Sequence, residues 1–182
     1  MRKLLSLAAV SALAVTLSNT ALAATADGTL GATSTGTVDV TLSIAEQFQI
    51  SDLDAFAFGA YTGTGDFDAN DDICVYHNGD GSYQVTVTDD SGVTANAFAV
   101  DDATDTNDIA MEVRWNDVAG TTGESTLTFN TALAQTGANT QATDCTTGGL
   151  SANLHVVLLE ADLQAASAGS YDSELTILIE PD

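Results

Sequence analysis

Residues 37–44 read Thr37-Val-Asp-Val-Thr-Leu-Ser-Ile44, and apolar and polar residues alternate along this stretch without a break. A period of two is typical of a β-strand with one apolar face and one polar face. The apolar side chains that share one face are Val38, Val40, Leu42 and Ile44. Such a strand can complete the sheet of its own chain or add to the sheet of a neighbouring molecule. The choice between these two uses determines both the fold and the function.

The first 23 residues have the pattern of a secretory signal peptide. Met1-Arg2-Lys3 is positively charged, residues 4–17 are almost wholly apolar or small, and Ala21-Leu22-Ala23 matches a small-x-small cleavage site. The apolar run is too short to be interpreted as a membrane span. We therefore expect an exported mature chain that begins at residue 24, long enough for one domain with its own core.

The mature chain is expected to be strongly acidic. All 26 acidic residues lie after the signal, where Arg114 is the only basic residue, so the formal charge is −25. Nucleic acid and anionic membrane surfaces would repel such a chain. The absence of lysine from the mature chain excludes lysine-dependent chemistry such as Schiff-base formation. The composition is typical of proteins whose self-repulsion is screened by salt.

The rest of the chain shows short strand patterns separated by clusters of Gly, Asp, Asn and Thr, and no convincing helix. Residues 83–87 alternate with a period of two, whereas residues 154–159 are almost continuously apolar, as in a buried central strand. A final strand is expected over residues 171–179. Residues 62–72 and 130–149 are expected to form loops. Short strands at this spacing predict an all-β sandwich.

Two cysteines, Cys74 and Cys145, occur in this exported chain. An oxidising compartment and an even count favour a disulfide between them. Such a bond would close a loop of about 70 residues and would stabilise the fold by about 4 kcal/mol in the chain-entropy model.

One acidic segment has oxygen-bearing side chains at alternate positions, as calcium loops do: Asp66, Asp68, Asn70 and Asp72. It lacks the glycine and the distant glutamate of an EF-hand, and a solvated loop without metal is the alternative.

The histidines and cysteines show no zinc spacing. No nucleophile, metalloprotease or phosphate-loop motif occurs, and the many carboxylates identify no glycosidase pair. We therefore expect no cofactor and no enzymatic activity.

Three segments in order resemble those of a known family. They are the stretch from Thr35 to Ile44, the stretch Phe56-Ala-Phe-Gly-Ala-Tyr61, and the ending Ala168-Gly-Ser-Tyr-Asp-Ser-Glu-Leu-Thr-Ile-Leu-Ile179. Together they are similar to a pilin of the archaic chaperone–usher type, in the spore-coat-protein-U-like group. The resemblance covers most of the mature chain.

The resemblance implies an incomplete immunoglobulin-like sandwich that lacks its last strand. In that family the N-terminal donor strand of the next subunit fills the groove. A periplasmic chaperone fills the groove until then, and an outer-membrane usher exports the fibre. The implied donor residues are Val38, Val40, Leu42 and Ile44, and the implied acceptor groove is lined by Tyr171, Leu175, Ile177 and Ile179. The family usually carries a cysteine soon after the donor strand, where this chain has Phe48, so Cys74 would pair with Cys145 instead.

These observations predict a signal peptide (1–23), an N-terminal extension with a donor strand (24–45) and a pilin sandwich (46–182). The expected function is that of a structural subunit of a pilus, exported through the periplasm to the cell surface and serving adhesion or biofilm formation. The expected partners are identical or related subunits, the chaperone and the usher, with no nucleic acid and no membrane insertion.

Two alternatives stay open at this point. The alternation over residues 37–44, taken alone, favours the chain's own first strand at the edge of an intramolecular sheet, and the resemblance reverses that preference. A monomeric acidic secreted β-sandwich that binds calcium or carbohydrate is the alternative function, and a secreted hydrolase is a more distant one.

Overall fold

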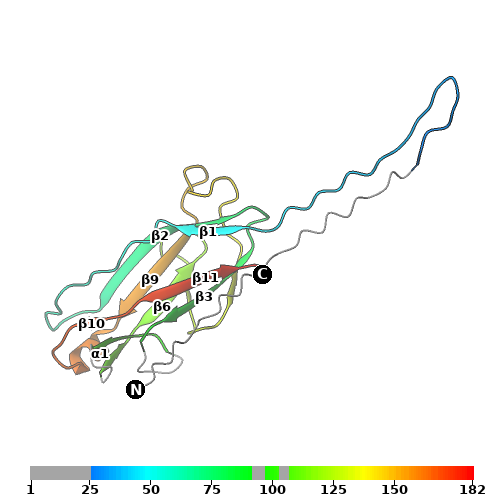
Figure 1. Cartoon of the computed structure of the whole chain (residues 1–182). Helices are drawn as coiled ribbons and strands as arrows, with labels where there is room; N and C mark the ends of the chain where they lie inside the picture. The colour runs from blue at the N-terminus through cyan, green and yellow to red at the C-terminus, as the bar shows by residue number, and fades with distance from the viewer. Residues whose placement is uncertain (1–25, 92–96, 103–106) are drawn as a thin grey trace, which may run out of the picture. The chain divides into compact units, whose positions relative to one another are not determined.

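A computed structural model describes residues 26–91, 97–102 and 107–182 of the chain (Figure 1). The expected signal peptide lies outside the described residues. The chain divides into two compact units, one that ends at Ile44 and one that extends from Ala45 to Asp182.

The described part of the N-terminal unit contains a single β-bridge, between Ala26 and Thr37. The Thr37 backbone N–H donates to the Ala26 carbonyl at 2.9 Å. Residues 38–44 are described throughout and belong to no helix or strand. Among the residues that the structure describes, the alternating pattern over 38–44 therefore pairs with no strand.

The C-terminal unit is an antiparallel β-sandwich, which confirms the predicted all-β, immunoglobulin-like fold. The first layer contains, in spatial order, β1 (Phe48–Ser51), β2 (Phe67–His77), β9 (Ala152–Leu158), β6 (Glu112–Asn116) and β7 (Ser125–Thr126). The second layer consists of two short sheets, β11–β3–β8 and β10–β4–β5. Their strands are β11 (Leu175–Glu180), β3 (Tyr83–Asp89), β8 (Leu133–Gln135), β10 (Tyr171–Asp172), β4 (Ala99–Asp102) and β5 (Asp108–Ala110).

The core lies between these layers and is built mainly from alternate residues of β2, β3 and β6 together with β9. Every residue of β9 is buried, and β9 lies between β2 and β6, as the continuous apolar run predicts. Trp115 of β6 and Tyr83 of β3 are both fully buried. The Trp115 indole N–H donates to the Tyr83 hydroxyl at 3.1 Å, so the hydrogen bond joins the two layers.

The structure corrects four sequence-based expectations. Residues 160–165 form a short helix, α1 (Glu160–Ala165), in a segment interpreted as an irregular connection. Alanine and glutamate favour helix, and the helix buries Leu163. β2 begins at Phe67, inside the expected loop, and β8 lies inside the other expected loop. The final strand is interrupted and forms β10 and β11.

Within the described ranges, no helix is long and apolar enough to cross a membrane.

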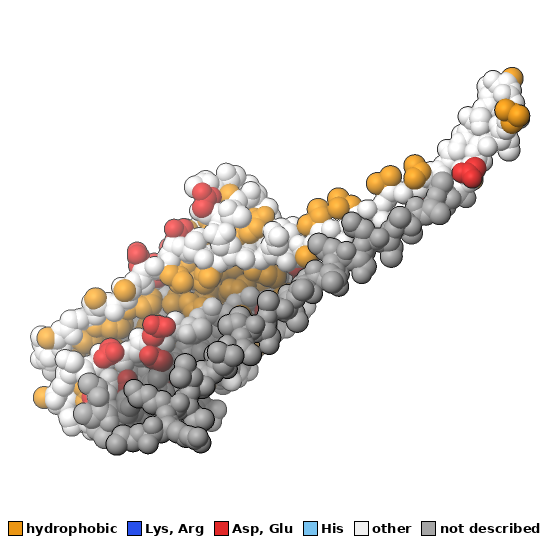
Figure 2. Space-filling model, in the orientation of Figure 1, with side chains coloured by type: hydrophobic (Ala, Val, Ile, Leu, Met, Phe, Trp, Pro, Cys, Tyr) orange, Lys and Arg blue, Asp and Glu red, His pale blue; other side chains and the backbone are white. Residues whose placement is uncertain are grey.

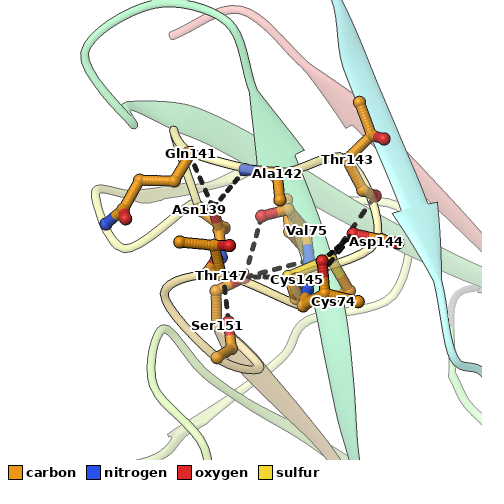
Figure 3. The surroundings of a disulfide bond; sticks show 12 residues. Cys74, Val75, Asn139, Gln141, Ala142, Thr143, Asp144, Cys145, Thr147 and Ser151 are labelled. Atoms are coloured by element: carbon orange, nitrogen blue, oxygen red, sulfur yellow. Dashed lines mark hydrogen bonds between the residues drawn. A yellow bond between two sulfur atoms is a disulfide. The ribbon is translucent and has the colours of Figure 1, made fainter.

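The predicted disulfide is present between Cys74 and Cys145, with an S–S distance of 2.05 Å and Cα atoms 5.7 Å apart (Figure 3). It ties the loop before β9 to β2. The side chain of Asn139 organises the same loop by four hydrogen bonds to its backbone, at Gln141, Ala142, Thr147 and Gly149. The long loop is therefore held at one end of the sandwich by a covalent bond and a buried amide.

Candidate subunit-binding groove

The outer edge of the second layer is open. β11 pairs with β3 on one side and β10 pairs with β4, and no strand of the described chain pairs with their other edges. The backbone N–H and C=O groups on an open edge form a template for a further strand. The open edge of the second layer is thus formed by β10 in one of its two sheets and by β11 in the other.

Successive side chains of β11 point alternately toward the core and toward solvent. Leu175, Ile177 and Ile179 are half-buried and pack against the core, whereas Thr176 and Leu178 point outward and are exposed. A completed core strand would bury its inward side chains fully, as β9 does. The inward residues of β11 therefore still expose apolar surface to solvent, which is unfavourable in water.

The other wall of the groove comes from the first layer, because β1 lies beside β11 across the opening. Phe48 and Ile50 of β1 are also half-buried against the core. Figure 2 shows a band of apolar side chains along this face of the sandwich, in the region where Figure 1 places β11 below β1 and β2. The band is an elongated apolar groove between the edges of the two layers.

A cavity of about 880 Å³ lies beside β10. Aromatic side chains line it: Phe58 stacks on Phe67 with ring centroids 5.4 Å apart, and Tyr61 meets Phe67 edge-on at 5.6 Å. Leu163 of α1 and Tyr171 of β10 complete the wall. The Tyr61 hydroxyl is buried without a hydrogen-bond partner. This cavity is large and aromatic enough to take a bulky apolar side chain.

The aromatic cavity is the part of the site that sequence reasoning missed. The stretch Phe56–Tyr61 supports the family resemblance, but its spacing gives no reason to place it beside Tyr171, more than 100 residues away. The sequence feature that could have indicated the cavity is the density of aromatic residues in Phe56–Tyr61, a segment without the alternation of a strand. The predicted groove residues Leu175, Ile177 and Ile179 share one face of β11, and Tyr171 lies on β10.

The four predicted donor residues lie in the N-terminal unit and are highly exposed. The exposed fractions of Val38, Val40, Leu42 and Ile44 are 69%, 89%, 86% and 78%. Scattered exposed apolar residues are common on protein surfaces, whereas four in strict alternation form a continuous apolar face.

The outward face of the first layer carries a charge network around Arg114, the basic residue of β6. Its guanidinium group contacts Glu112 at 2.6 Å and Glu124 at 2.8 Å. The other oxygen of Glu124 lies 2.8 Å from Nδ1 of the buried His155, and Asp68 lies 3.1 Å from Nε2 of the same ring. The network therefore joins β2, β9 and β6 on the side away from the core.

This network shifts the ionisation of its members. Burial opposes the ionisation of Glu124, but hydrogen bonds from Arg114 and His155 outweigh that effect and hold the pKa of Glu124 below its usual range. Hydrogen bonds to Glu112 and Glu124 raise the pKa of Arg114. In the core, burial raises the pKa of Tyr83. The charges are paired with one another and lie outside the groove, so they indicate a stabilising role.

The segment considered for calcium has a strand geometry from Phe67 onward. Same-face neighbours on a strand lie about 6.6 Å apart, whereas ligands of one calcium ion must all lie within about 2.6 Å of it. Asp72 accepts hydrogen bonds from the Gly120 N–H and the Asn153 amide, and Asn70 accepts another from Asn153. Asp66 accepts from the backbone N–H of Glu160. Among the described residues, no group of three or more His, Cys, Asp or Glu side chains could hold a metal. The segment therefore gives no support to a calcium site.

No known protein-family model matches this chain, and no curated protein matches it. Some solved structures are similar to it. One is a chain of a complex described as "Chaperone-tip adhesin complex is vital for synergistic activation of CFA/I fimbriae biogenesis", with a TM-score of 0.55 and 18% sequence identity over 74% of this chain. This chain spans 41% of that one. At this identity the likeness shows the fold alone.

A second similar structure is the CsuC–CsuE chaperone–tip adhesion subunit pre-assembly complex from archaic chaperone–usher Csu pili of Acinetobacter baumannii. Its TM-score is 0.44 and its identity 13%, over 76% of this chain and 40% of that one. A likeness this low is no evidence of a shared role.

Proposed function

We propose that this protein is a structural subunit of an extracellular fibre, a pilus, that assembles by donor-strand exchange. In this proposal residues 37–44 of one copy dock beside β11 of another copy and complete its sandwich. The single observation that carries it is the presence of two complementary features in one chain. They are an open, apolar sheet edge and an alternating segment whose four apolar side chains are exposed.

The two features are complementary in pattern. Leu175, Ile177 and Ile179 face inward at every second position of β11. A strand paired with β11 therefore presents inward side chains with the same period, and the alternation over residues 38–44 supplies them. The docked strand would also pair with the free backbone groups of the edge.

The expected gain in free energy is large. Burying a Val, Leu or Ile side chain contributes roughly 1.5–3 kcal/mol, so four side chains contribute on the order of 6–12 kcal/mol before the cost of ordering the segment. A contact of this strength suits a permanent fibre. The open groove also suggests why a chaperone and an usher would be needed, since bare apolar edges aggregate before assembly. Export to the cell surface, with a role in adhesion or biofilm formation, follows from the family resemblance.

Two matched substitutions in the mature chain test the proposal. Leu42→Asp places a charge on the apolar face of the segment, and Ile177→Asp places one in the groove. We expect wild-type chains to form multimers in light scattering, and each variant alone to remain monomeric. A mixture of the two variants should form dimers, because the segment of the Ile177→Asp chain is intact and so is the groove of the Leu42→Asp chain.

The alternation supplies controls for both sites. Thr41→Asp and Leu178→Asp introduce the same charge one position away, on the outward face, and should leave assembly unchanged. Near-ultraviolet circular dichroism of buried Trp115 reports whether each variant is folded. Multimers that persist in the Leu42→Asp chain, or a variant mixture that stays monomeric although both chains are folded, would contradict donor-strand assembly.

A further inference from the structure

The residues just before β1, at the start of the second unit, are held by the turn after β2. Three hydrogen bonds join Asn78 to the residues just before β1. The Asn78 backbone N–H donates to the Gln47 carbonyl at 3.2 Å, the Gln47 N–H donates to the Asn78 side-chain oxygen at 2.8 Å, and the Asn78 side-chain amide donates to the Ala45 carbonyl at 3.0 Å. The contact between the two segments is thereby continued past Phe48, by a backbone hydrogen bond at Gln47 and a side-chain hydrogen bond at Ala45.

The turn that presents Asn78 is itself tightly determined. The ring of His77 stacks on Phe48 with centroids 4.3 Å apart, and its Nδ1 accepts from the Gly81 N–H at 3.2 Å. A Cβ atom at Gly79 would lie 2.7 Å from the His77 ring, so a larger residue does not fit without movement. Gly81 has φ +93° and its carbonyl accepts from the Ala138 N–H. Asn78 is therefore a fixed anchor.

The donor residues lie directly before the anchored residues, and this short spacing opposes docking of the segment in the groove of its own chain. Ile44 is directly followed by the anchored Ala45, and the backbone hydrogen bond at Gln47 extends the pairing of β1 with β2 by one residue. The groove runs beside β1, because β1 lies next to β11. For the segment to enter its own groove, the chain would have to fold back alongside β1, and a reversal uses at least two residues in the turn.

With Ala45 anchored, a reversal would have to use residues such as Ser43 and Ile44. Ile44 would then lie in the turn, and Leu42 would lose its place in the groove or shift along it. At most part of the apolar face could therefore dock. Residues nearer the N-terminus could not replace the lost apolar contacts, because Gly36, Thr35 and Ser34 have little apolar surface. We infer that Asn78 positions the extension so that it completes a second copy of this chain and not its own sandwich. This inference rests on the proposed donor-strand function.

An insertion tests the inference in the full mature chain. Six residues, Gly-Ser-Gly-Ser-Gly-Ser, are placed between Ile44 and Ala45, and the control chain carries the same insertion between Gly31 and Ala32. We expect the control to form multimers like the wild type. The chain with the insertion after Ile44 should remain monomeric and melt at a higher temperature than the Leu42→Asp monomer, because its own segment now fills its groove.

The outcomes separate the inference from the proposed function. If both insertion variants form multimers to the same extent, the inference is wrong and donor-strand assembly stands. If the wild type itself forms no multimers and the Leu42→Asp substitution changes nothing, the proposed function fails, and the inference fails with it.

Substitution of Asn78 supplies a finer test of the anchor. Asn78→Ala removes both side-chain hydrogen bonds, whereas Asn78→Asp keeps the acceptor for Gln47 and loses the donor to Ala45. We expect the monomer fraction to rise several-fold in Asn78→Ala and by less in Asn78→Asp, as measured by size-exclusion chromatography. A lower melting temperature with an unchanged ratio of monomer to multimer would show that Asn78 is merely structural and would overturn its positioning role.

Discussion

β9 and β11 are both apolar strands of one sandwich, but they differ in what surrounds them. β9 has a paired strand on each side and all seven of its residues are buried. β11 has a paired strand on one side, and its inward residues Leu175, Ile177 and Ile179 remain half-buried. The difference shows that apolar content alone does not make a core strand. Position in the sheet decides whether a strand stabilises its own chain or remains available to another molecule.

The largest expected effect is a charge placed in β9. Val156→Asp would bury a carboxylate without a partner at a position that is 2% exposed. We expect it to destabilise the fold by about 4 kcal/mol or more. Denaturant unfolding measures the change, and Ile177→Asp in β11 is the comparison, with a much smaller loss in the monomer. Equal losses at the two sites would contradict the distinction between a closed strand and an open one.

The next effect concerns the disulfide, which joins β2 to the loop before β9. The double variant Cys74→Ser/Cys145→Ser removes a cross-link between positions 71 residues apart. We expect a loss of about 2–5 kcal/mol in the free energy of unfolding. The measurement is a thermal melt, and the reduced wild-type chain is the control. A variant that melts like the oxidised wild type would show that the loop before β9 is held by Asn139 and its neighbours alone.

A milder pair of substitutions sharpens the comparison between the two strands. In the Leu42→Asp background, Val156→Ala should cost about 2–3 kcal/mol and Ile177→Ala about 1 kcal/mol, because Ile177 is only half-buried. A synthetic peptide of residues 34–46 should then bind the Val156→Ala chain normally and the Ile177→Ala chain more weakly. Isothermal titration measures both affinities. Equal affinities would indicate that the peptide does not lie beside β11.

The smallest expected effect is in the pH dependence of stability. The pKa of Glu124 in the folded chain lies below its usual range. Its contribution is therefore fully present above the unfolded-state pKa and is lost as the pH falls through the folded-state pKa, in the acidic range below about pH 4.5. We expect Glu124→Gln to be less stable than the wild type by about 1 kcal/mol at pH 7. That difference should shrink on acidification.

The difference between the two chains is the quantity to measure, because protonation of the many other carboxylates changes the stability of both. The formal charge of the mature chain is strongly negative, so acidification also relieves repulsion. Urea unfolding at pH 7, 5 and 3 gives the difference. A constant difference across this range would show that Glu124 is not held ionised by Arg114 and His155.

Much of the sandwich follows from the sequence because it depends on local patterns. The alternation in Tyr83–Val87 and the continuous apolar run at 154–159 each predict the burial that β3 and β9 show. The presence of two cysteines in a chain expected to be exported predicts the disulfide between Cys74 and Cys145. The helix α1 was missed because its six residues are too few to show a helical period, and it is stabilised by burial of Leu163.

The sequence by itself determined the all-β class, the inward and outward faces of the strands, the disulfide and the apolar face of residues 38–44. Only the tertiary structure decided which strand has an open edge, which aromatic residues form the cavity next to it, and that Asn78 anchors the start of β1. The physical reason is that alternation is a property of neighbours in the chain, whereas an edge, a cavity and an anchor each depend on residues that are brought together only when distant strands pair.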